Sequence, residues 1–251
     1  MTSKRWALVT GGARRLGRAV ALEAARRGWN VVIQYHDSRE EAESVARDAA
    51  PYGAIVEPVK AELGGGDDGA LIDLAAKAAH THLSALVNCA AIFEHDTVGA
   101  ISNAAFERHM HINALAPSQL MSAFAKALPE SERGAVVNFL DYKLAAPYAD
   151  HFSYTLSKYA LSGASELAAR ALAPRVRVNA VASGYVLPSP GQSEEDFRRL
   201  HPQTPLGRGT TPQDVATAVL FLLENEAVTG QTIYLDSGLR FAPADRDFMF
   251  R

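Results

Sequence analysis

The sequence predicts an α/β protein, a single doubly wound domain built on a seven-stranded parallel sheet. Short apolar runs that suit strands alternate with longer stretches in which apolar residues recur at helical spacing. Several of these runs are continuously apolar, which is typical of parallel strands covered by helices on both faces. We find no linker, repeat or low-complexity segment in residues 1–251, so we expect one domain.

Turn residues separate the predicted elements in the first half of the chain. Gly11 ends the first strand, and Gly28 ends the helix that follows it. Asp37 and Ser38 are placed to cap the second helix, because a glutamate follows each of them by three residues. The predicted strands are 6–9, 31–33, 54–56 and 85–88, and the predicted helices are 14–27, one that begins near 38, 67–80 and 104–128.

Proline marks the boundaries in the second half. Pro174 ends one helix, and Pro212 lies in the first turn of the last helix. The predicted strands are 135–140, 176–181 and 233–235, and the predicted helices are 153–173 and 212–223. Residues 187–211 are rich in Pro, Gly and Ser without predicted secondary structure, so we expect them to form a substrate loop.

The composition argues against several function classes. A net charge of -3 and a pI near 6.2 are atypical of proteins that bind nucleic acid or anionic membranes. Apolar stretches are too short to span a bilayer, and no signal-peptide pattern precedes the first strand. Cys89 is the single cysteine, which excludes an internal disulfide, and the histidines show no metal-ligand spacing. We therefore expect a cytoplasmic protein without a metal.

Two motifs indicate chemistry. Residues 10–17, Thr-Gly-Gly-Ala-Arg-Arg-Leu-Gly, join the first strand to the first helix, where glycines let the backbone approach a pyrophosphate at a helix N-terminus. Tyr154 and Lys158 lie four residues apart and share a helix face. A phenol becomes a useful acid near neutral pH when a nearby cation stabilises its phenolate, and Lys158 is placed to do so.

Together these motifs resemble the short-chain dehydrogenase/reductase family. The resemblance extends from about Trp6 to Leu239 and implies a Rossmann-like sheet, NAD(H) or NADP(H) as cofactor, and often a homotetramer. Asn113 resembles the family's structural asparagine, which is thought to hold a water that relays protons to the lysine. Further segments that carry the resemblance are 88–90, 178–180, 205–208, 212–216 and 229–231.

Three departures within that family resemble the pteridine reductases. Arg15 replaces the second glycine of the first turn, and Asp141 replaces the catalytic serine 13 positions before Tyr154. Phe93 follows the turn after the fourth strand. The resemblance implies NADPH-dependent reduction of a pterin such as dihydrobiopterin, and of folates as a further class. A flat pterin can stack on an aromatic ring, and a carboxylic acid beside a tyrosine can supply the proton that its C=N nitrogen must gain.

The expected site residues follow from the resemblance. The catalytic set is Asn113, Asp141, Tyr154 and Lys158, and the substrate set is Arg15, Phe93, Asp141 and Tyr154. The cofactor set is Gly11, Arg14, Arg15, Leu16, Gly17, Tyr35, His36, Ser38, Glu62, Asn88, Ala90, Lys158 and Gly184.

NADPH is the expected cofactor, and NADH is the alternative. Arg14, Arg15, His36 and Ser38 offer cations and donors to a 2′-phosphate, whereas Asp37 stands where an acid can bind the ribose of NAD. Two other functions stay open: a carbonyl or 3-oxoacyl reductase of the same family, and a non-catalytic cofactor-binding protein.

Overall fold

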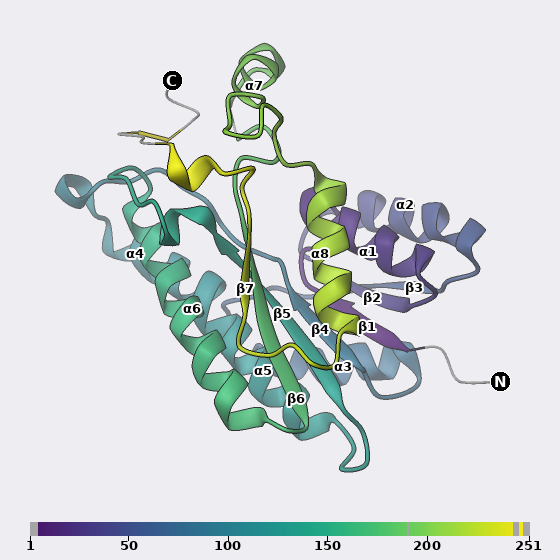
Figure 1. Ribbon diagram of the computed structural model, residues 1–251. Coiled ribbons are helices and arrows are strands. Elements are labelled where there is room, and N and C mark those ends of the chain that lie inside the picture. Colours follow the sequence, from purple (N-terminus) through teal and green to yellow (C-terminus); the bar gives the residue numbers. More distant parts are fainter. Residues whose placement is uncertain (1–4, 190, 243–245, 248–251) are drawn as a thin grey trace.

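Seven parallel strands form one sheet in the computed structural model, which describes residues 5–189, 191–242 and 246–247 (Figure 1). The strand order is β3-β2-β1-β4-β5-β6-β7. The strands are β1 (Trp6–Val9), β2 (Asn30–Tyr35), β3 (Val56–Lys60), β4 (Ala85–Asn88), β5 (Gly134–Asp141), β6 (Val176–Ser183) and β7 (Thr232–Leu235). This is the doubly wound α/β fold predicted from the alternating apolar patterns.

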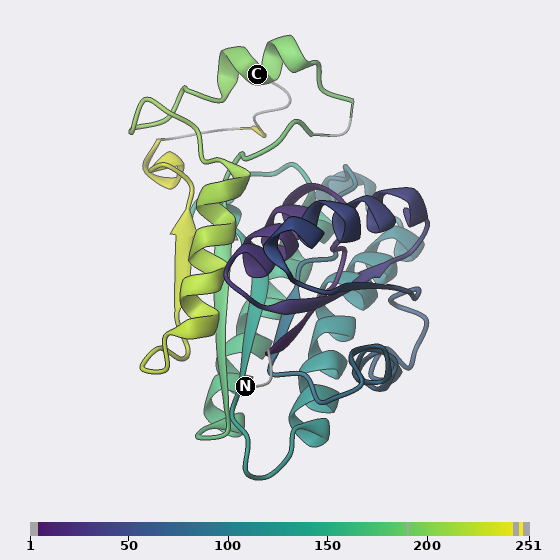
Figure 2. The ribbon, with the colours of Figure 1, turned by 90° about the vertical axis from the view of Figure 1, so that its right-hand side faces the viewer.

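Helices cover both faces of the sheet (Figures 1 and 2). One face packs against α1 (Arg15–Arg26), α2 (Arg39–Ala49) and α8 (Pro212–Glu224), and the other packs against α3 (Ala70–Ala79), α5 (Ala116–Ala127) and α6 (Phe152–Leu172). Fully buried Val and Leu residues in β1 and β4 separate two apolar clusters, one on each face. Burial on both faces explains why these strands are continuously apolar in sequence.

The predicted strand 54–56 begins two residues and ends four residues too early, because β3 spans Val56–Lys60. Ile55 is half exposed, and pairing with β2 begins at Val56. The strand contains Pro58, which an edge strand tolerates because one side of its backbone has no partner strand. The prediction placed this edge strand too early because Glu57, Pro58 and Lys60 interrupt its apolar pattern.

The predicted helix 104–128 is not a single α-helix. The chain forms α4 (Asn103–Met110), a π-helical turn η3 (His111–Leu115) and then α5. Pro117 lies in the first turn of α5, where its missing N–H does least harm. The π turn contains Asn113, one of the expected catalytic residues.

The segment 187–211 is also more regular than expected, because it contains helix α7 (Glu194–Leu200). Ser193 caps this helix by accepting a hydrogen bond from the Asp196 N–H. Three acidic residues occupy the first turn and two arginines the last, which suits the helix dipole. The helix lies beyond the carboxyl end of the sheet (Figure 2).

The strand order reverses between β1 and β4, so the turns that follow these two strands diverge from neighbouring positions. In open parallel sheets, ligands bind outside the carboxyl ends of the strands at such a reversal. No helix in the described part of the chain is both long and apolar enough to cross a membrane.

Candidate active site

A cavity of about 430 Å³ lies at this edge of the sheet, a volume that suits a small molecule. Its walls come from the turns after β1 and β4, the ends of β5 and β6, and helix α6. The lining residues are Gly11, Arg14, Arg15, Leu16, Gly17, Cys89, Ala90, Ala91, Phe93, Phe139, Leu140, Asp141, Tyr142, Lys143, Tyr148, Tyr154, Lys158, Ser183, Gly184, Tyr185, Val186, Leu187, Ser189 and Asp247.

The turn after β1 is shaped so that backbone faces the cavity. Gly11 has φ +62°, and a Cβ there would lie 3.1 Å from the Cα of Ala90. A Cβ on Gly17 would collide with the carbonyl of Gly11, so the helix can start this close to the turn only with glycine. Thr10 ties this turn to the one after β4, because its Oγ1 accepts hydrogen bonds from the N–H groups of Cys89 and Ala90.

Gln34 supports the same turn and was missed by sequence reasoning. Its side chain is buried, its Oε1 accepts from the Gly11 N–H at 2.9 Å, and its Nε2 donates to the Ala61 carbonyl at 2.6 Å. The sequence signal that could have identified it is a glutamine directly after the apolar run of a predicted strand, because a polar side chain buried there needs hydrogen-bond partners.

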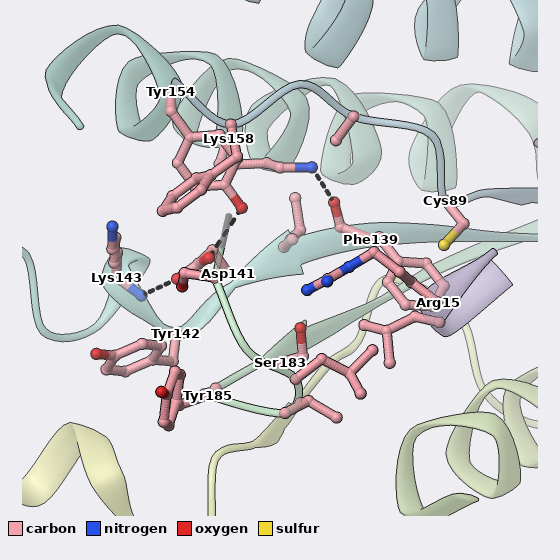
Figure 3. Close-up of a pocket in the computed structure, with 18 of the residues that line it drawn as sticks. Arg15, Cys89, Phe139, Asp141, Tyr142, Lys143, Tyr154, Lys158, Ser183 and Tyr185 are labelled. Carbon is pink, nitrogen blue, oxygen red and sulfur yellow. Dashed lines mark hydrogen bonds between the residues drawn. The ribbon is translucent and has the colours of Figure 1, made fainter. Parts of the chain in front are cut away.

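Arg15 adopts a left-handed conformation with φ +50° at the start of α1. This conformation is strained for a residue with a side chain. Its guanidinium donates to the Pro188 carbonyl at 2.9 Å, which links the first turn to the segment after β6. In Figure 3 the Arg15 side chain extends into the cavity toward Asp141 and Ser183.

Asp141 and Tyr154 form a hydrogen-bonded pair inside the cavity (Figure 3). Asp141 ends β5, and Tyr154 lies in the first turn of α6. The Tyr154 hydroxyl donates to Asp141 Oδ2 at 2.8 Å, and the Lys143 N–H donates to Oδ1 at 2.9 Å. The sequence-predicted register between the two residues thus brings a carboxyl and a phenol into direct contact.

Burial raises the pKa of the Asp141 carboxyl, and the charge of Lys143 opposes this shift. Burial and the adjacent Asp141 carboxylate also raise the pKa of Tyr154 well above its ordinary value. Burial is the larger of these two causes. The expectation that Lys158 makes Tyr154 a stronger acid stays a prediction.

Lys158 is buried and donates from Nζ to the Phe139 carbonyl at 2.8 Å. Its ammonium lies 5.6 Å from the centre of the Tyr154 ring, not against the phenol oxygen. Burial lowers the pKa of Lys158 to about 8, while the Asp141 charge acts in the opposite direction. Lys158 is thus a cation near neutral pH, and its ammonium loses a proton at mildly alkaline pH.

Asn113 lies outside the cavity lining and is fully buried. Its side chain accepts from the Ile92 N–H at 2.9 Å and donates to the Ile92 carbonyl and to Ser157 Oγ, both at 3.0 Å. These bonds hold the chain after β4 against α6. The structure therefore gives Asn113 a positioning geometry, and its expected relay role stays a prediction.

Phe93 reaches the cavity, but one face of its ring already has a partner. The His151 ring stacks on it at 3.9 Å between centroids, and the Tyr154 ring meets it edge-on at 4.7 Å. The Lys143 ammonium also lies over this ring, 4.9 Å from its centre, so a flat substrate that stacks on Phe93 must displace one of these partners. Stacking with substrate remains a prediction for this residue.

The structure brings eleven of the predicted site residues to the cavity and leaves six outside its lining. Those at the cavity are Gly11, Arg14, Arg15, Leu16, Gly17, Ala90, Phe93, Asp141, Tyr154, Lys158 and Gly184. Those outside are Tyr35, His36, Ser38, Glu62, Asn88 and Asn113. Asn88 is buried and donates to Asn138 Oδ1 at 2.8 Å, whereas Glu62 is exposed.

Asp37 and Ser38 do not form the predicted helix cap. Ser38 holds the N-cap position of α2 without a side-chain hydrogen bond, and Asp37 Oδ2 lies 3.1 Å from His36 Nδ1. Both His36 and Asp37 are exposed. Arg14 forms an ion pair with Glu41 of α2, which places a cation near this corner of the fold.

Lys143, Tyr148 and Asp247 complete one end of the cavity and were missed by sequence reasoning. The Lys143 ammonium lies 2.8 Å from Asp247 Oδ2, and the Tyr148 hydroxyl donates to the same oxygen at 3.0 Å. Lys143 follows Asp141 at a strand end, which is a usable signal. Asp247 lies in the C-terminal tail, where sequence pattern carries no such signal; Phe248 to Phe250 lie outside the described residues.

Comparisons with known proteins agree on the family. The family model described as enoyl-(acyl carrier protein) reductase matches residues 11–240. The 3-oxoacyl-[acyl-carrier-protein] reductase FabG of Staphylococcus aureus is 29% identical over an aligned length of 247 residues, and the match covers 95% of this chain and 99% of that protein. The structure of FolM alternative dihydrofolate reductase 1 from Brucella suis, in complex with NADP, superposes with a TM-score of 0.91 at 39% identity and covers 97% of this chain and 98% of that chain. The angucycline C-6 ketoreductase LanV with bound NADP gives 0.86 at 27% identity, with 95% and 96% covered. The chain therefore belongs to the short-chain dehydrogenase/reductase family.

Proposed function

We propose that this protein is an NADPH-dependent reductase that acts on the C=N bond of a pterin, with dihydrobiopterin-like compounds and folates as the substrate class. The observation that carries the proposal is the buried hydrogen bond between Tyr154 and Asp141. The similarity to an alternative dihydrofolate reductase solved with NADP supports it.

The turn after β1 fits the pyrophosphate of a dinucleotide. Gly11 and Gly17 leave no side chain between the backbone and the cavity, and the N-terminus of α1 adds positive potential there. Arg14, Leu16 and Ala90 would hold the same part of the cofactor. Lys158 and Gly184 line the end of the cavity near Asp141 and would hold the nicotinamide half.

When bound, NADPH supplies a hydride to the carbon of the substrate C=N bond, and the nitrogen must gain one proton. The Asp141–Tyr154 pair would provide that proton, because burial favours the neutral carboxylic acid. A serine at this position could only polarise a carbonyl oxygen. Lys158 would hold positive charge beside the pair and help to replace the proton after transfer.

The proposed preference for NADPH over NADH rests on the corner between α1 and α2. Arg14 offers a cation there, although it is paired with Glu41, and His36 offers a second donor. Asp37 opposes a 2′-phosphate, but its carboxylate is exposed and lies against His36. Tyr35 and Ser38 flank the same corner.

A 3-oxoacyl reductase is the second candidate function, because FabG from Staphylococcus aureus is similar over nearly its whole length. A substrate ketone needs a proton on oxygen and an activating hydroxyl, which Tyr154 alone could supply. Asp141 separates the two candidates, since a carboxyl in place of serine favours protonation of nitrogen.

We also propose a localisation and an oligomeric state. The protein would be a cytoplasmic homotetramer, and homotetramers are common in the family. Leu156, Tyr159 and Leu167 expose apolar surface along α6, and they would be covered in such an assembly.

Asp141→Ser tests the proposed function. We expect this variant to lose at least ~100-fold in kcat on dihydrobiopterin, the scale of a lost general acid, while a reactive ketone is reduced no worse. The wild-type rate on the pterin should fall as pH rises through the raised pKa of Asp141, because only the protonated acid donates. Initial rates for both substrates with NADPH and NADH across a pH series give the measurement.

Equal losses on pterin and ketone would show that Asp141 is structural. An unchanged pterin rate in the variant would contradict the pterin proposal and favour the ketone reductase.

A further inference from the structure

A second lysine lies beside the proposed proton donor, and it carries its own counter-ion. Lys143 follows β5 and is 2% exposed. Its ammonium lies 2.8 Å from the carboxylate of Asp247, whose side chain is 7% exposed. The two residues are more than a hundred positions apart in sequence, and their buried ion pair holds Asp247 at one end of the cavity.

The tail residue is held in place from several sides. The Tyr148 hydroxyl donates to Asp247 Oδ2 at 3.0 Å, and the Asp247 N–H donates to Asp150 Oδ2 at 3.0 Å. Arg246 Nε lies 3.6 Å from the same Oδ2 of Asp150, and His95 Nε2 lies 3.7 Å from Asp150 Oδ1. These contacts fix the carboxylate against Lys143.

The two lysines lie at equal distances from the Tyr154 ring. Each ammonium lies 5.6 Å from the centre of the Tyr154 ring, Lys143 from η4 (Tyr142–Leu144) and Lys158 from α6. The Lys143 ammonium also lies over the rings of Phe93 and Tyr148, at 4.9 and 4.6 Å. Lys143 thus belongs to the immediate surroundings of the Asp141–Tyr154 pair.

Most titratable side chains facing the pair are neutral near neutral pH. Burial raises the pKa of Cys89 and Tyr185, each to about 12, and it raises that of Tyr148 further. Burial lowers the pKa of His151. Tyr142 shares a hydrogen bond with Tyr148 at 2.9 Å.

The formal charges facing the pair are few. Among the described residues that line the cavity, the remaining charged side chains are those of Arg14, Arg15, Lys143, Lys158 and Asp247. Arg14 pairs with Glu41, and Arg15 donates to Pro188. Lys143 is the cation whose charge a carboxylate from the tail cancels.

We propose that Lys143 and Asp247 are positioning residues that together set the protonation state of the Asp141–Tyr154 pair. The ammonium of Lys143 favours the ionised carboxylate of Asp141, and the carboxylate of Asp247 weakens that effect. The tail thereby keeps the proton on the donor. This inference rests on the proposed function, in which the protonated pair supplies the proton.

The test compares the apparent pKa of the pair in four variants. Without Lys143, as in Lys143→Met, the pKa should rise by about one pH unit, and in Asp247→Asn it should fall by a similar amount. The double variant should return toward the wild type, and Lys143→Arg should keep the wild-type value. If Lys143 and Asp247 acted only through packing, the two single variants would not shift the pKa of the pair in opposite directions.

Two readouts are needed. The first is the ¹³Cγ chemical shift of Asp141 during a pH titration of the protein without substrate, assigned with Asp141→Asn. The second is the pH midpoint of kcat on dihydrobiopterin. If the wild type does not reduce dihydrobiopterin, the proposed function fails, while the carboxyl titration still decides the role of the ion pair.

The inference would be overturned if the titration midpoint of Asp141 did not change in the two single variants, or if it moved in the same direction in both. If Lys143→Met does not fold, the double variant, which buries no unpaired charge, is compared with Asp247→Asn. An equal Asp141 titration in these two proteins overturns the inference as well.

Discussion

At the scale of single residues, Asp141 influences the pKa of both Tyr154 and Lys158. Its carboxyl accepts a hydrogen bond from the Tyr154 hydroxyl. Burial, and after it the Asp141 charge, raises the pKa of Tyr154, and the same charge opposes the burial effect on Lys158. A serine here would place no carboxylate beside the phenol. We therefore propose the coupled pair, and not the tyrosine alone, as the proton donor.

Tyr154→Phe removes the hydroxyl that joins the pair and leaves the ring in place. We expect kcat to fall at least ~100-fold, because a proton donor is lost while substrate contacts stay. Lys158→Ala should fall by a similar factor. Tyr159→Phe is the matched control, since its hydroxyl lies on the same helix and donates to the Leu144 carbonyl outside the cavity. Near-full activity in Tyr154→Phe contradicts the assignment.

Site residues next to strand ends could be predicted from the sequence, and residues from distant segments could not. Tyr154 was predicted from its four-residue spacing to Lys158, and Asp141 from the resemblance, which places it 13 positions before Tyr154. The place of Asp247 depends on contacts with residues about a hundred positions earlier, which no local pattern encodes. Phe93 was predicted by resemblance, but its stacking on His151 depends on a turn conformation, φ +59° at His151, that the sequence does not reveal.

At the scale of elements, Glu23 connects helices α1 and α8. Its side chain is 1% exposed, bonds Arg26 and Arg27 on its own helix, and accepts from Gln213 Nε2 at 3.0 Å. The hydrogen bond from Arg26 is the largest cause that lowers the pKa of Glu23 to about 2. The apolar spacing of both helices predicted their packing, whereas this buried carboxylate was not foreseen.

Glu23→Gln should lower the free energy of unfolding by roughly 2 kcal/mol near neutral pH. The folded-state pKa lies below the unfolded value of 4.5, so the stabilisation is complete above that pH. It should disappear as pH falls toward about 2. Urea melts across this range give the measurement.

The control for this prediction is Glu43→Gln. Glu43 pairs with Arg39 on the surface of α2, where both side chains are exposed, so we expect a change below about 0.5 kcal/mol. A loss in Glu23→Gln that does not depend on pH would mean that packing, and not charge, explains it.

At the scale of the whole molecule, the cavity is closed by segments from both ends of the chain. The turn after β1 forms one wall, and residues 185–189 after β6 and the tail at Asp247 form others. The parallel sheet brings these distant segments together, because every strand ends at the same edge. The fold class and strand count were predictable from periodicity alone, but the covering segments follow no period.

The segment 187–211 is expected to act as a substrate lid. Phe197 and His201 of this segment stack at 4.5 Å, and Phe197 also packs on Tyr185 of the cavity wall at 5.0 Å. Leu200 of α7 also packs in one buried cluster with Tyr142 and Tyr185 of the cavity wall, so a ligand that contacts Tyr185 would also stabilise α7. We expect NADPH with a non-reacting pterin to slow backbone hydrogen exchange in residues 191–201 by at least ~10-fold, since bound states open less often. Helix α3 lies away from the cavity and serves as the internal control.

Phe197→Ala should remove most of this protection and raise KM for the pterin more than it lowers kcat. If the ligands leave exchange in 191–201 as fast as in the free protein, the segment is a static wall and not a lid.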